Sequence, residues 1–208
     1  MITQTSQSQA AMTSVAALEM LKDGNARFVA RRMNDRDLID QVEQTATGQY
    51  PFATILSCID SRVSAELVFD QGVGDIFSAR VAGNIVNEDL LGSMEFACKL
   101  AGTRIIVVLG HTSCGAVKGA CDGAQMGNLT ALLSKINPAV QAVSEPSDPA
   151  QRTSKNLDFV NEVAKTNVAM TIENIRKDSP VLKDMEDAGE IAIVGAMYDI
   201  STGEVHFY

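Results

Sequence analysis

The stretch that does most to decide the fold is RIIVVLGH, residues 104–111. It is continuous, rich in β-branched side chains and ended by a glycine at 110. A run of this kind predicts a strand buried on both faces, as strands are in a parallel sheet. A second buried strand is predicted at 52–57, within PFATILSC, because a proline and a polar cluster bound a shorter apolar run there.

Outward from these two strands, helical and strand patterns alternate along the chain. Such alternation predicts an α/β fold with a mainly parallel central sheet, flanked by helices and joined by right-handed crossovers. The sequence contains no interdomain linker or internal repeat, so residues 1–208 are predicted to form a single domain. We expect helices at 13–32, about 64–69, 87–101, 115–122, about 127–143 and about 154–178, and further strands at 74–83 and on both sides of a Ser-Thr-Gly turn within 190–208.

The composition is that of an ordinary globular protein and excludes some partners. Hydrophobic residues make up 46% and charged residues 21% of the 208 residues, and the net charge is −9. The chain has no cluster of Lys and Arg to bind phosphates, which argues against nucleic acid as a partner. No apolar run approaches the ~18 residues of a membrane span, and the polar N-terminus has no secretory pattern. Four unevenly spaced cysteines are too few for a disulfide framework, so we expect a cytoplasmic protein.

Three metal-binding residue types follow the two predicted strands. Cys58 comes directly after 52–57, His111 comes just after the strand that begins at 104, and Cys114 lies three residues further on. Ligands gather beyond the carboxyl ends of the strands in open α/β sheets, so these side chains should meet. Two thiolates and one imidazole suit zinc, and three protein ligands leave a fourth position for water.

Other readings of the cysteines and histidines stay open at this point. Taken singly, each of these residues is more often a core residue than a ligand. Cys121, on the same face of a predicted helix as Cys114, could complete a structural Cys₃His site. Cys98 falls within a helical apolar pattern and is expected to be structural, and His206 alternates within the last predicted strand.

Asp60 and Arg62 stand two and four residues after Cys58. Beside a zinc ligand, Asp60 could accept a hydrogen bond from metal-bound water, or it could take the open coordination position itself. Arg62 could pair with Asp60 and hold it ionised. Zinc would lower the pKa of its bound water from ~15.7 to about 7 and so supply hydroxide at neutral pH.

These residues carry a resemblance to a known family. CIDSRV at 58–63, followed by HTSCGAVKG at 111–119, resembles the paired signatures of β-carbonic anhydrases. The likeness covers most of the chain, including LEMLKDGNARFV at 18–29 and GAMYDISTGEVHF at 195–207. It implies the β-carbonic anhydrase fold with an N-terminal helical arm at 1–35, one Zn²⁺ per chain, and reversible hydration of carbon dioxide to bicarbonate and a proton.

The resemblance also implies a role for each site residue and a homodimer, with pairing of dimers into tetramers left open. The metal ligands would be Cys58, His111 and Cys114. Asp60 and Arg62 would form the catalytic pair. The residues implied to bind carbon dioxide or bicarbonate are Gln49, typically from the partner subunit, Phe77 and Phe96 along a narrow apolar cleft, Ala82, where some members place valine, and Gly83 and Gly115 near the metal.

Two departures from the family pattern bear on regulation and proton transfer. Phe96 and Leu100 stand where some plant members carry tyrosine and histidine, so the proton relay proposed for those members is not expected here. Ile55 stands where members with a regulatory bicarbonate site carry tryptophan. Arg80 and Tyr198 match the rest of that site, but without the tryptophan we expect no regulatory site and an open, water-bound metal.

Two alternatives to a carbonic anhydrase remain at this stage. A hydrolase of carbonyl sulfide or carbon disulfide would use the same zinc and the same Asp–Arg pair, and the sequence separates it poorly. A non-enzymatic structural zinc module would have four protein ligands and no such pair.

Overall fold

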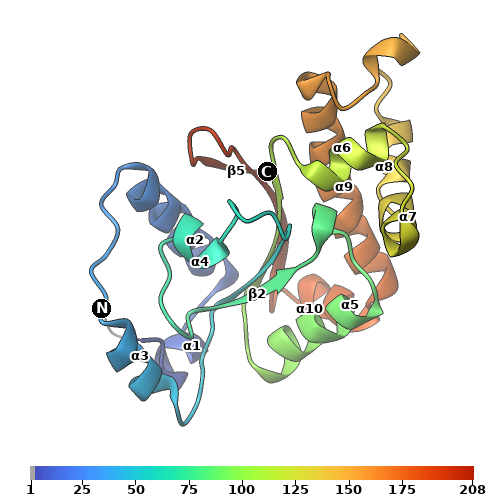
Figure 1. Cartoon of the computed structure of the whole chain (residues 1–208). Coiled ribbons are helices and arrows are strands. Elements are labelled where there is room, and N and C mark those ends of the chain that lie inside the picture. The colour runs from blue at the N-terminus through green and yellow to red at the C-terminus, as the bar shows by residue number, and fades with distance from the viewer. Residues whose placement is uncertain (1–2) are drawn as a thin grey trace.

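The computed structural model describes residues 3–208, which form an α/β fold around one five-stranded sheet. The strand order is β2-β1-β3-β4-β5, and the two edge strands, β2 and β5, are labelled in Figure 1. All pairings are parallel except that of β4 with β5, which is antiparallel. The bounds are β1 Ala53–Ser57, β2 Ile76–Arg80, β3 Ile105–His111, β4 Ala192–Tyr198 and β5 Val205–Phe207. The predicted fold class is therefore confirmed.

The two strands that the sequence marks most clearly form the centre of the sheet. Every residue of β1 and β3 is buried, as expected for continuous apolar runs covered on both faces. Ser57, the last residue of β1, pairs with Leu109 of β3. Cys58 and His111 therefore lie near each other at the carboxyl edge of the sheet. His111, which was predicted to come just after this strand, is its last residue.

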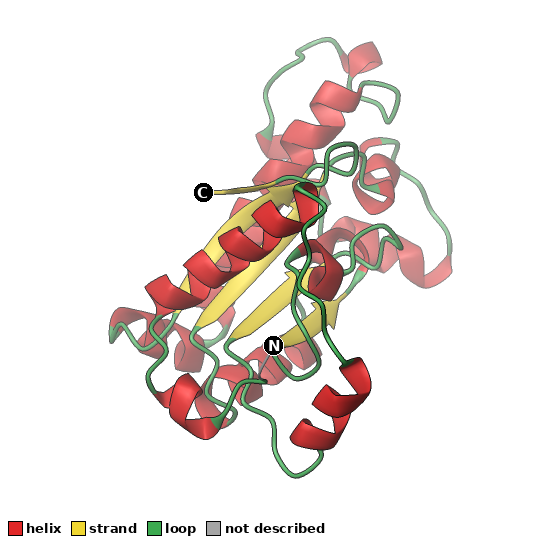
Figure 2. Ribbon diagram, turned by 90° about the vertical axis from the view of Figure 1, so that its left-hand side faces the viewer, coloured by secondary structure: helices red, strands yellow, loops and turns green. Residues whose placement is uncertain are grey.

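Helices cover both faces of the sheet (Figure 2). On one face, Leu21 of α2 (Ser14–Val29) joins the core beneath Ile55 and Val107. On the other face, Val168 of α9 (Leu157–Asp178) packs in the core that contains Leu56. Ile55 and Leu56 of β1 thus face opposite sides of the sheet, as neighbouring residues of a strand do. The helical segments are α1 Ser6–Ala10, α3 Leu38–Thr45, α4 Ala65–Val68, η1 Ala82–Asn84, α5 Glu88–Glu95, η2 Phe96–Leu100, α6 Gly115–Cys121, α7 Gly127–Ser134, α8 Asn137–Ala142, η3 Pro149–Gln151 and α10 Pro180–Asp187, with α2 and α9 as given above.

Three helices, α1, α3 and α10, are not predicted by the sequence patterns, and one predicted helix is wrong. The continuous helix expected at 127–143 is instead α7 and α8, with a break at Lys135 and Ile136. Pro138 lies in the first turn of α8, where its missing N–H costs nothing. In the middle of a longer helix the same proline would remove a hydrogen bond and clash with the preceding turn.

The N-terminal arm predicted at 1–35 contains α1 and α2, and its first two residues lie outside the described part of the chain. α2 buries Ala17 and Leu21 in the core of its own chain. Within residues 3–208, no helix is both long enough and apolar enough to cross a membrane.

Candidate metal centre and active site

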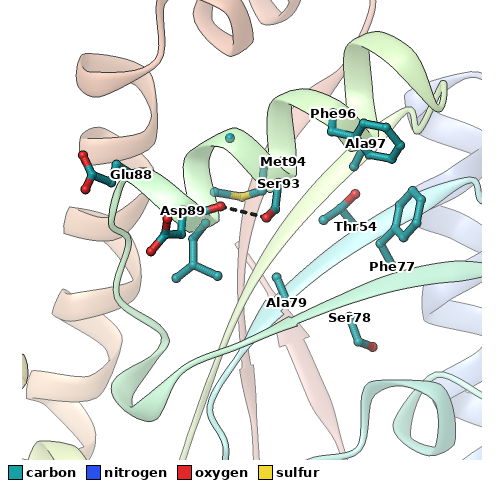
Figure 3. Close-up of a pocket in the computed structure, with 12 residues that line it drawn as sticks. Thr54, Phe77, Ser78, Ala79, Glu88, Asp89, Ser93, Met94, Phe96 and Ala97 are labelled. Carbon is teal, nitrogen blue, oxygen red and sulfur yellow. Dashed lines mark hydrogen bonds between the residues drawn. The ribbon is translucent and has the colours of Figure 1, made fainter.

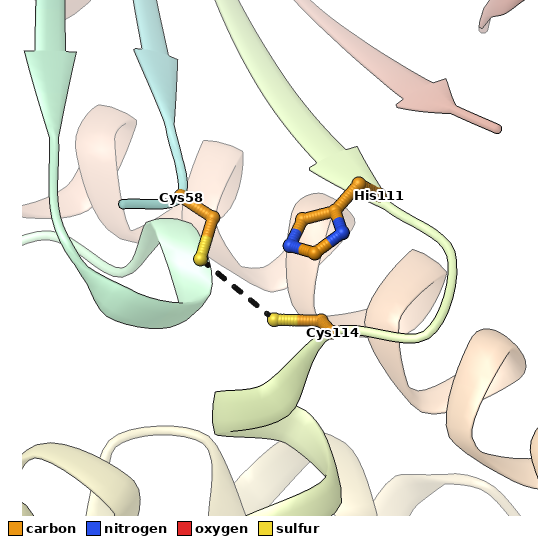
Figure 4. A group of neighbouring side chains, drawn as sticks. All are labelled: Cys58, His111 and Cys114. Carbon is orange, nitrogen blue, oxygen red and sulfur yellow. Dashed lines mark hydrogen bonds between the residues drawn. The ribbon is translucent and has the colours of Figure 1, made fainter. Parts of the chain in front are cut away.

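Three candidate ligand atoms from two segments of the chain converge at the carboxyl edge of the sheet. Cys58 follows β1, His111 ends β3, and Cys114 precedes the first residue of α6 (Figure 4). One ligand atom from each residue lies within 4.8 Å of the other two, and the two sulfurs are 3.9 Å apart. All three residues are buried. The structure thus brings together the set that the sequence predicts, from positions up to 56 residues apart.

The His111 ring is oriented for metal binding through Nε2. Its Nδ1 lies 2.9 Å from the backbone oxygen of Thr112, so Nδ1 carries the proton and donates it to that carbonyl. Nε2 is buried and has no hydrogen-bond partner among the described residues. A buried polar atom without a partner costs free energy. A metal ion held by Nε2 and the two sulfurs would satisfy this atom, so the residues fit a zinc ion.

The Cys58 and Cys114 sulfurs also share one proton between them. Sharing a proton with the Cys114 thiol lowers the pKa of the Cys58 thiol, and the Gly83 N–H lowers it further, against the opposing effect of burial. The pKa of Cys114 is raised, because its thiol shares the proton with Cys58 and because it is buried. A divalent cation would replace the shared proton, since metal ligation requires both sulfurs as thiolates.

Asp60 and Arg62 form a two-pronged ion pair beside the three ligands. Arg62 Nε and Nη2 lie 2.9 and 2.7 Å from the two carboxylate oxygens of Asp60. Hydrogen bonds from Arg62 hold the pKa of Asp60 well below its usual range, and the same contacts raise the pKa of Arg62. Asp60 Oδ2 is 3.9 Å from His111 Nε2. The pairing of Arg62 with Asp60 that the sequence analysis considered is present in the structure.

Three of the predicted substrate-binding positions adjoin this centre. Gly83, in η1, donates its N–H to Cys58 Sγ at 3.4 Å. Gly83 has a φ of +71°, and an added Cβ would lie 2.5 Å from Ile136 Cδ1, so both its conformation and its surroundings require glycine. Ala82 precedes it in the same turn, and Gly115 follows Cys114 directly. A Cβ at Gly115 would meet nothing within 4 Å, so that glycine leaves open space beside the metal ligands.

Gln49, Phe77 and Phe96 lie away from the metal centre of their own chain. Gln49 is exposed before the start of β1, whereas Cys58 follows its end. Phe77 on β2 pairs with Thr54, four residues before Cys58, which corresponds to roughly 13 Å along the strand. The Phe77 and Phe96 rings meet edge to face, 6.4 Å between centroids, in a pocket of about 620 Å³ that we term the β2-edge pocket (Figure 3). Phe77 and Phe96 therefore form a second group within one chain, apart from the metal centre.

One contact at the centre was assigned differently from the sequence. Arg80, matched there to a regulatory site, donates from Nε to the Cys58 carbonyl at 3.0 Å and from Nη2 to the Asp60 carbonyl at 2.7 Å. Arg80 thus fixes the backbone that carries both Cys58, a candidate metal ligand, and Asp60. No sequence signal reveals this, because the contact depends on the pairing of β2 with β1.

The remaining cysteines and the second histidine stand apart from the cluster. Cys98 is buried next to Thr103, and burial raises the pKa of its thiol to about 11. Cys121 ends α6, and His206 is exposed on β5. Within residues 3–208, the metal-binding group consists of Cys58, His111 and Cys114 alone. The four-ligand site that would include Cys121 is therefore not formed.

A mainly parallel sheet with a Cys-His-Cys centre at its carboxyl edge, beside an Asp–Arg pair, defines a metal-site enzyme of the β-carbonic anhydrase class. The family model described as carbonic anhydrase matches residues 53–205. The chain belongs to the carbonic anhydrase family and is a β-class carbonic anhydrase.

Individual relatives agree with this assignment. Carbonic anhydrase 2 of Mycobacterium tuberculosis is 38% identical over 190 residues, which cover 91% of this chain and 90% of that protein. The solved structure of the β-carbonic anhydrase CcaA is 26% identical, with a TM-score of 0.72, and the match covers 93% of this chain and 92% of that one. One of two tetrameric β-carbonic anhydrases from Sordaria macrospora shares the fold at 22% identity, with a TM-score of 0.67 and coverage of 81% and 89%.

Proposed function

We propose that this carbonic anhydrase binds one zinc ion per chain through Cys58 Sγ, His111 Nε2 and Cys114 Sγ, and that it catalyses the reversible hydration of carbon dioxide to bicarbonate and a proton. One observation carries the proposal: the two sulfurs and a buried, unpartnered imidazole nitrogen lie within 4.8 Å of one another. Relatives named carbonic anhydrase at 38% identity support the reaction.

The chemistry divides between the ion and the side chains. A zinc ion bound there would lower the pKa of a water molecule in its fourth position toward neutrality. Asp60 would accept a hydrogen bond from that water and so orient it toward carbon dioxide. Because Arg62 keeps the Asp60 carboxylate ionised, Asp60 stays an acceptor throughout the neutral pH range. Arg80 holds the loop that carries Asp60, and Gly83 donates to the Cys58 sulfur.

The substrate cleft is proposed to be completed by a second copy of the chain. Gln49, Phe77 and Phe96 are too far along the sheet to reach Cys58 in their own chain. Phe96 is 51% and Leu100 76% exposed. Both belong to η2, whose Phe96 ring meets Phe77 of the edge strand β2, and these apolar side chains would be covered in a dimer. In a homodimer, each copy would present its amide donor and its two aromatic rings to the metal centre of the other. An apolar wall with few polar groups suits carbon dioxide.

A cytoplasmic location is proposed because all four cysteines are free thiols and two of them belong to the metal centre.

The decisive test measures zinc content and carbon dioxide hydration in one preparation, with carbonyl sulfide and carbon disulfide as competing substrates. We expect one zinc per chain, with carbon dioxide turned over fastest. A zinc-free active enzyme would contradict the proposed metal, and faster turnover of carbonyl sulfide or carbon disulfide would contradict the proposed substrate.

A further inference from the structure

Helix α9 is linked to the metal centre by hydrogen bonds through a buried asparagine. Asn167 is 3% exposed, and its Nδ2 donates to the Gly83 carbonyl at 2.8 Å. Gly83 in turn donates its own N–H to Cys58 Sγ at 3.4 Å. Because the Asn167 amide faces a carbonyl, its nitrogen must be the atom in contact, which makes it a donor. A chain of two hydrogen bonds therefore joins α9 to the first ligand sulfur.

A second asparagine of the same helix holds the other ligand segment. Asn161 Oδ1 accepts the N–H of Ser113 at 2.9 Å. Ser113 lies between His111 and Cys114 and has a φ of +56°, a conformation that residues other than glycine seldom adopt. Such a conformation persists where surrounding contacts fix it. The Asn161 acceptor fixes the one residue whose backbone turns the chain from His111 toward Cys114.

The position of α9 against the sheet is itself closely fitted. An added Cβ at Gly110 would lie 2.6 Å from Val168 Cγ2, and one at Gly195 would lie 2.9 Å from Val168 Cγ1. The two glycines let the helix approach β3 and β4 closely just before His111. Asn161 and Asn167 thus stand on a helix whose distance from β3 is set by packing.

We propose that Asn161 and Asn167 are positioning residues of the metal centre, each fixing one of the two ligand-bearing segments. Asn167 aims the Gly83 N–H at the Cys58 sulfur, and Asn161 holds the turn that brings Cys114 to His111. The inference rests on the proposed zinc site. Residues that orient metal ligands through hydrogen bonds typically change metal affinity or activity 10–100-fold when they are removed.

The test compares four variants of the full-length chain. Asn167→Leu removes the donor and Asn161→Leu removes the acceptor, at nearly unchanged volume. Asn161→Asp keeps an acceptor oxygen and should rescue the second site. Asn174→Leu is the matched control, because Asn174 is exposed two turns along the same helix. Zinc affinity is measured by chelator competition, the thiolate-to-metal absorption band after cobalt substitution, and thermal unfolding on the metal-free proteins.

We expect zinc affinity to fall about 10–100-fold in both Asn→Leu variants at positions 161 and 167, with a shifted cobalt–thiolate band. Asn161→Asp and Asn174→Leu should stay within about twofold of the parent chain in zinc affinity. If Asn167→Leu does not fold, as the metal-free unfolding would show, the Asn161→Leu and Asn161→Asp pair decides. Unchanged zinc affinity and cobalt spectra in folded Asn→Leu variants would overturn the inference while leaving the zinc site intact. Failure of the parent chain to bind zinc would instead overturn the proposed function.

Discussion

The metal centre and the β2-edge pocket differ in how much of each is finished within one chain. Cys58, His111 and Cys114 are buried, and hydrogen bonds fix the residues around them. The β2-edge pocket contains the edge-to-face pair of Phe77 and Phe96, and Phe96 and Leu100 of η2 are exposed. The candidate metal ligands are thus brought together within one chain, whereas the proposed cleft would need a second surface. Variants on the two sides should therefore fail in different ways.

The largest effect is expected from losing a ligand. Cys58→Ser or Cys114→Ser should abolish zinc binding and carbon dioxide hydration together, because an alcohol does not ionise to replace a thiolate ligand. Cys98→Ser removes an equally buried sulfur outside the cluster and should keep both properties. Zinc content and hydration rate measured on the three variants check this, and a metal-loaded Cys58→Ser enzyme would contradict the ligand assignment.

Asp60→Asn should separate catalysis from metal binding at the same centre. The variant keeps the shape but loses the ionised acceptor, so hydration should slow by about 10²–10⁴-fold while zinc remains bound. The pKa of Asp60 is depressed by Arg62, so its charge is present above the usual aspartate pKa of about 3.9 and is lost only as pH falls below it. The ratio of parent to variant rates should thus stay constant from pH 6 to 9. A ratio that changes through neutral pH would rule out this role for Asp60.

A charge on the exposed apolar surface of η2 should disrupt the proposed dimer. Leu100→Glu would bury a carboxylate in the proposed dimer interface, which costs several kcal/mol and should weaken association by about 10²-fold or more. We expect monomers that still bind one zinc but hydrate carbon dioxide slowly. Sedimentation and zinc analysis on one sample check this, and a fully active monomer would contradict the shared cleft.

The smallest effect is expected at the second histidine. His206 is exposed on β5 and its imidazole faces Glu204 at 4.0 Å, not the metal ligands. His206→Ala should therefore change the maximal rate by less than about twofold.

Since Phe96 and Leu100 carry no proton, the maximal rate should rise with imidazole buffer at fixed pH, and the ratio of kcat to KM should stay flat. A maximal rate independent of buffer would reveal an internal proton carrier.

The central strands and the ligand set could be predicted because their signals are local. A continuous β-branched run specifies a doubly covered strand, and in a parallel sheet two such strands carry whatever follows them to the same edge. Cys58 and His111 are placed by this rule alone. Asp60 and Arg62 follow because they share the loop with Cys58.

The missed elements had weaker or competing signals. α3 lies in a mostly polar stretch, and its apolar residues Leu38, Ile39 and Val42 are exposed rather than packed in the core. α10 does carry a start signal, a Ser179 cap followed by Pro180 in the first turn, and this signal was available in the sequence.

Residues that act across the sheet could not be predicted from one sequence. Asn161 and Asn167 sit in a helical pattern, where asparagine is usually a solvated surface residue. Their partners, Ser113 and Gly83, are 48 and 84 positions away along the chain. The proposed contribution of Gln49 to a partner's cleft likewise rests on family resemblance alone, because nothing local links Gln49 to Cys58.

The close seat of Val168 against Gly110 and Gly195 has a consequence for how this chain can vary. A methyl group added at either glycine would crowd Val168, and at Gly110 also Met197, so α9 would be displaced together with Asn161 and Asn167, the proposed positioning residues. A matching loss of volume at Val168, together with a shift of Met197 for position 110, would be needed to leave the helix in place, since cores tolerate exchanges that conserve volume far better than single enlargements. Positions 110, 168 and 195 are therefore epistatic: variation at one of them is constrained by the other two, although none of the three touches the reaction.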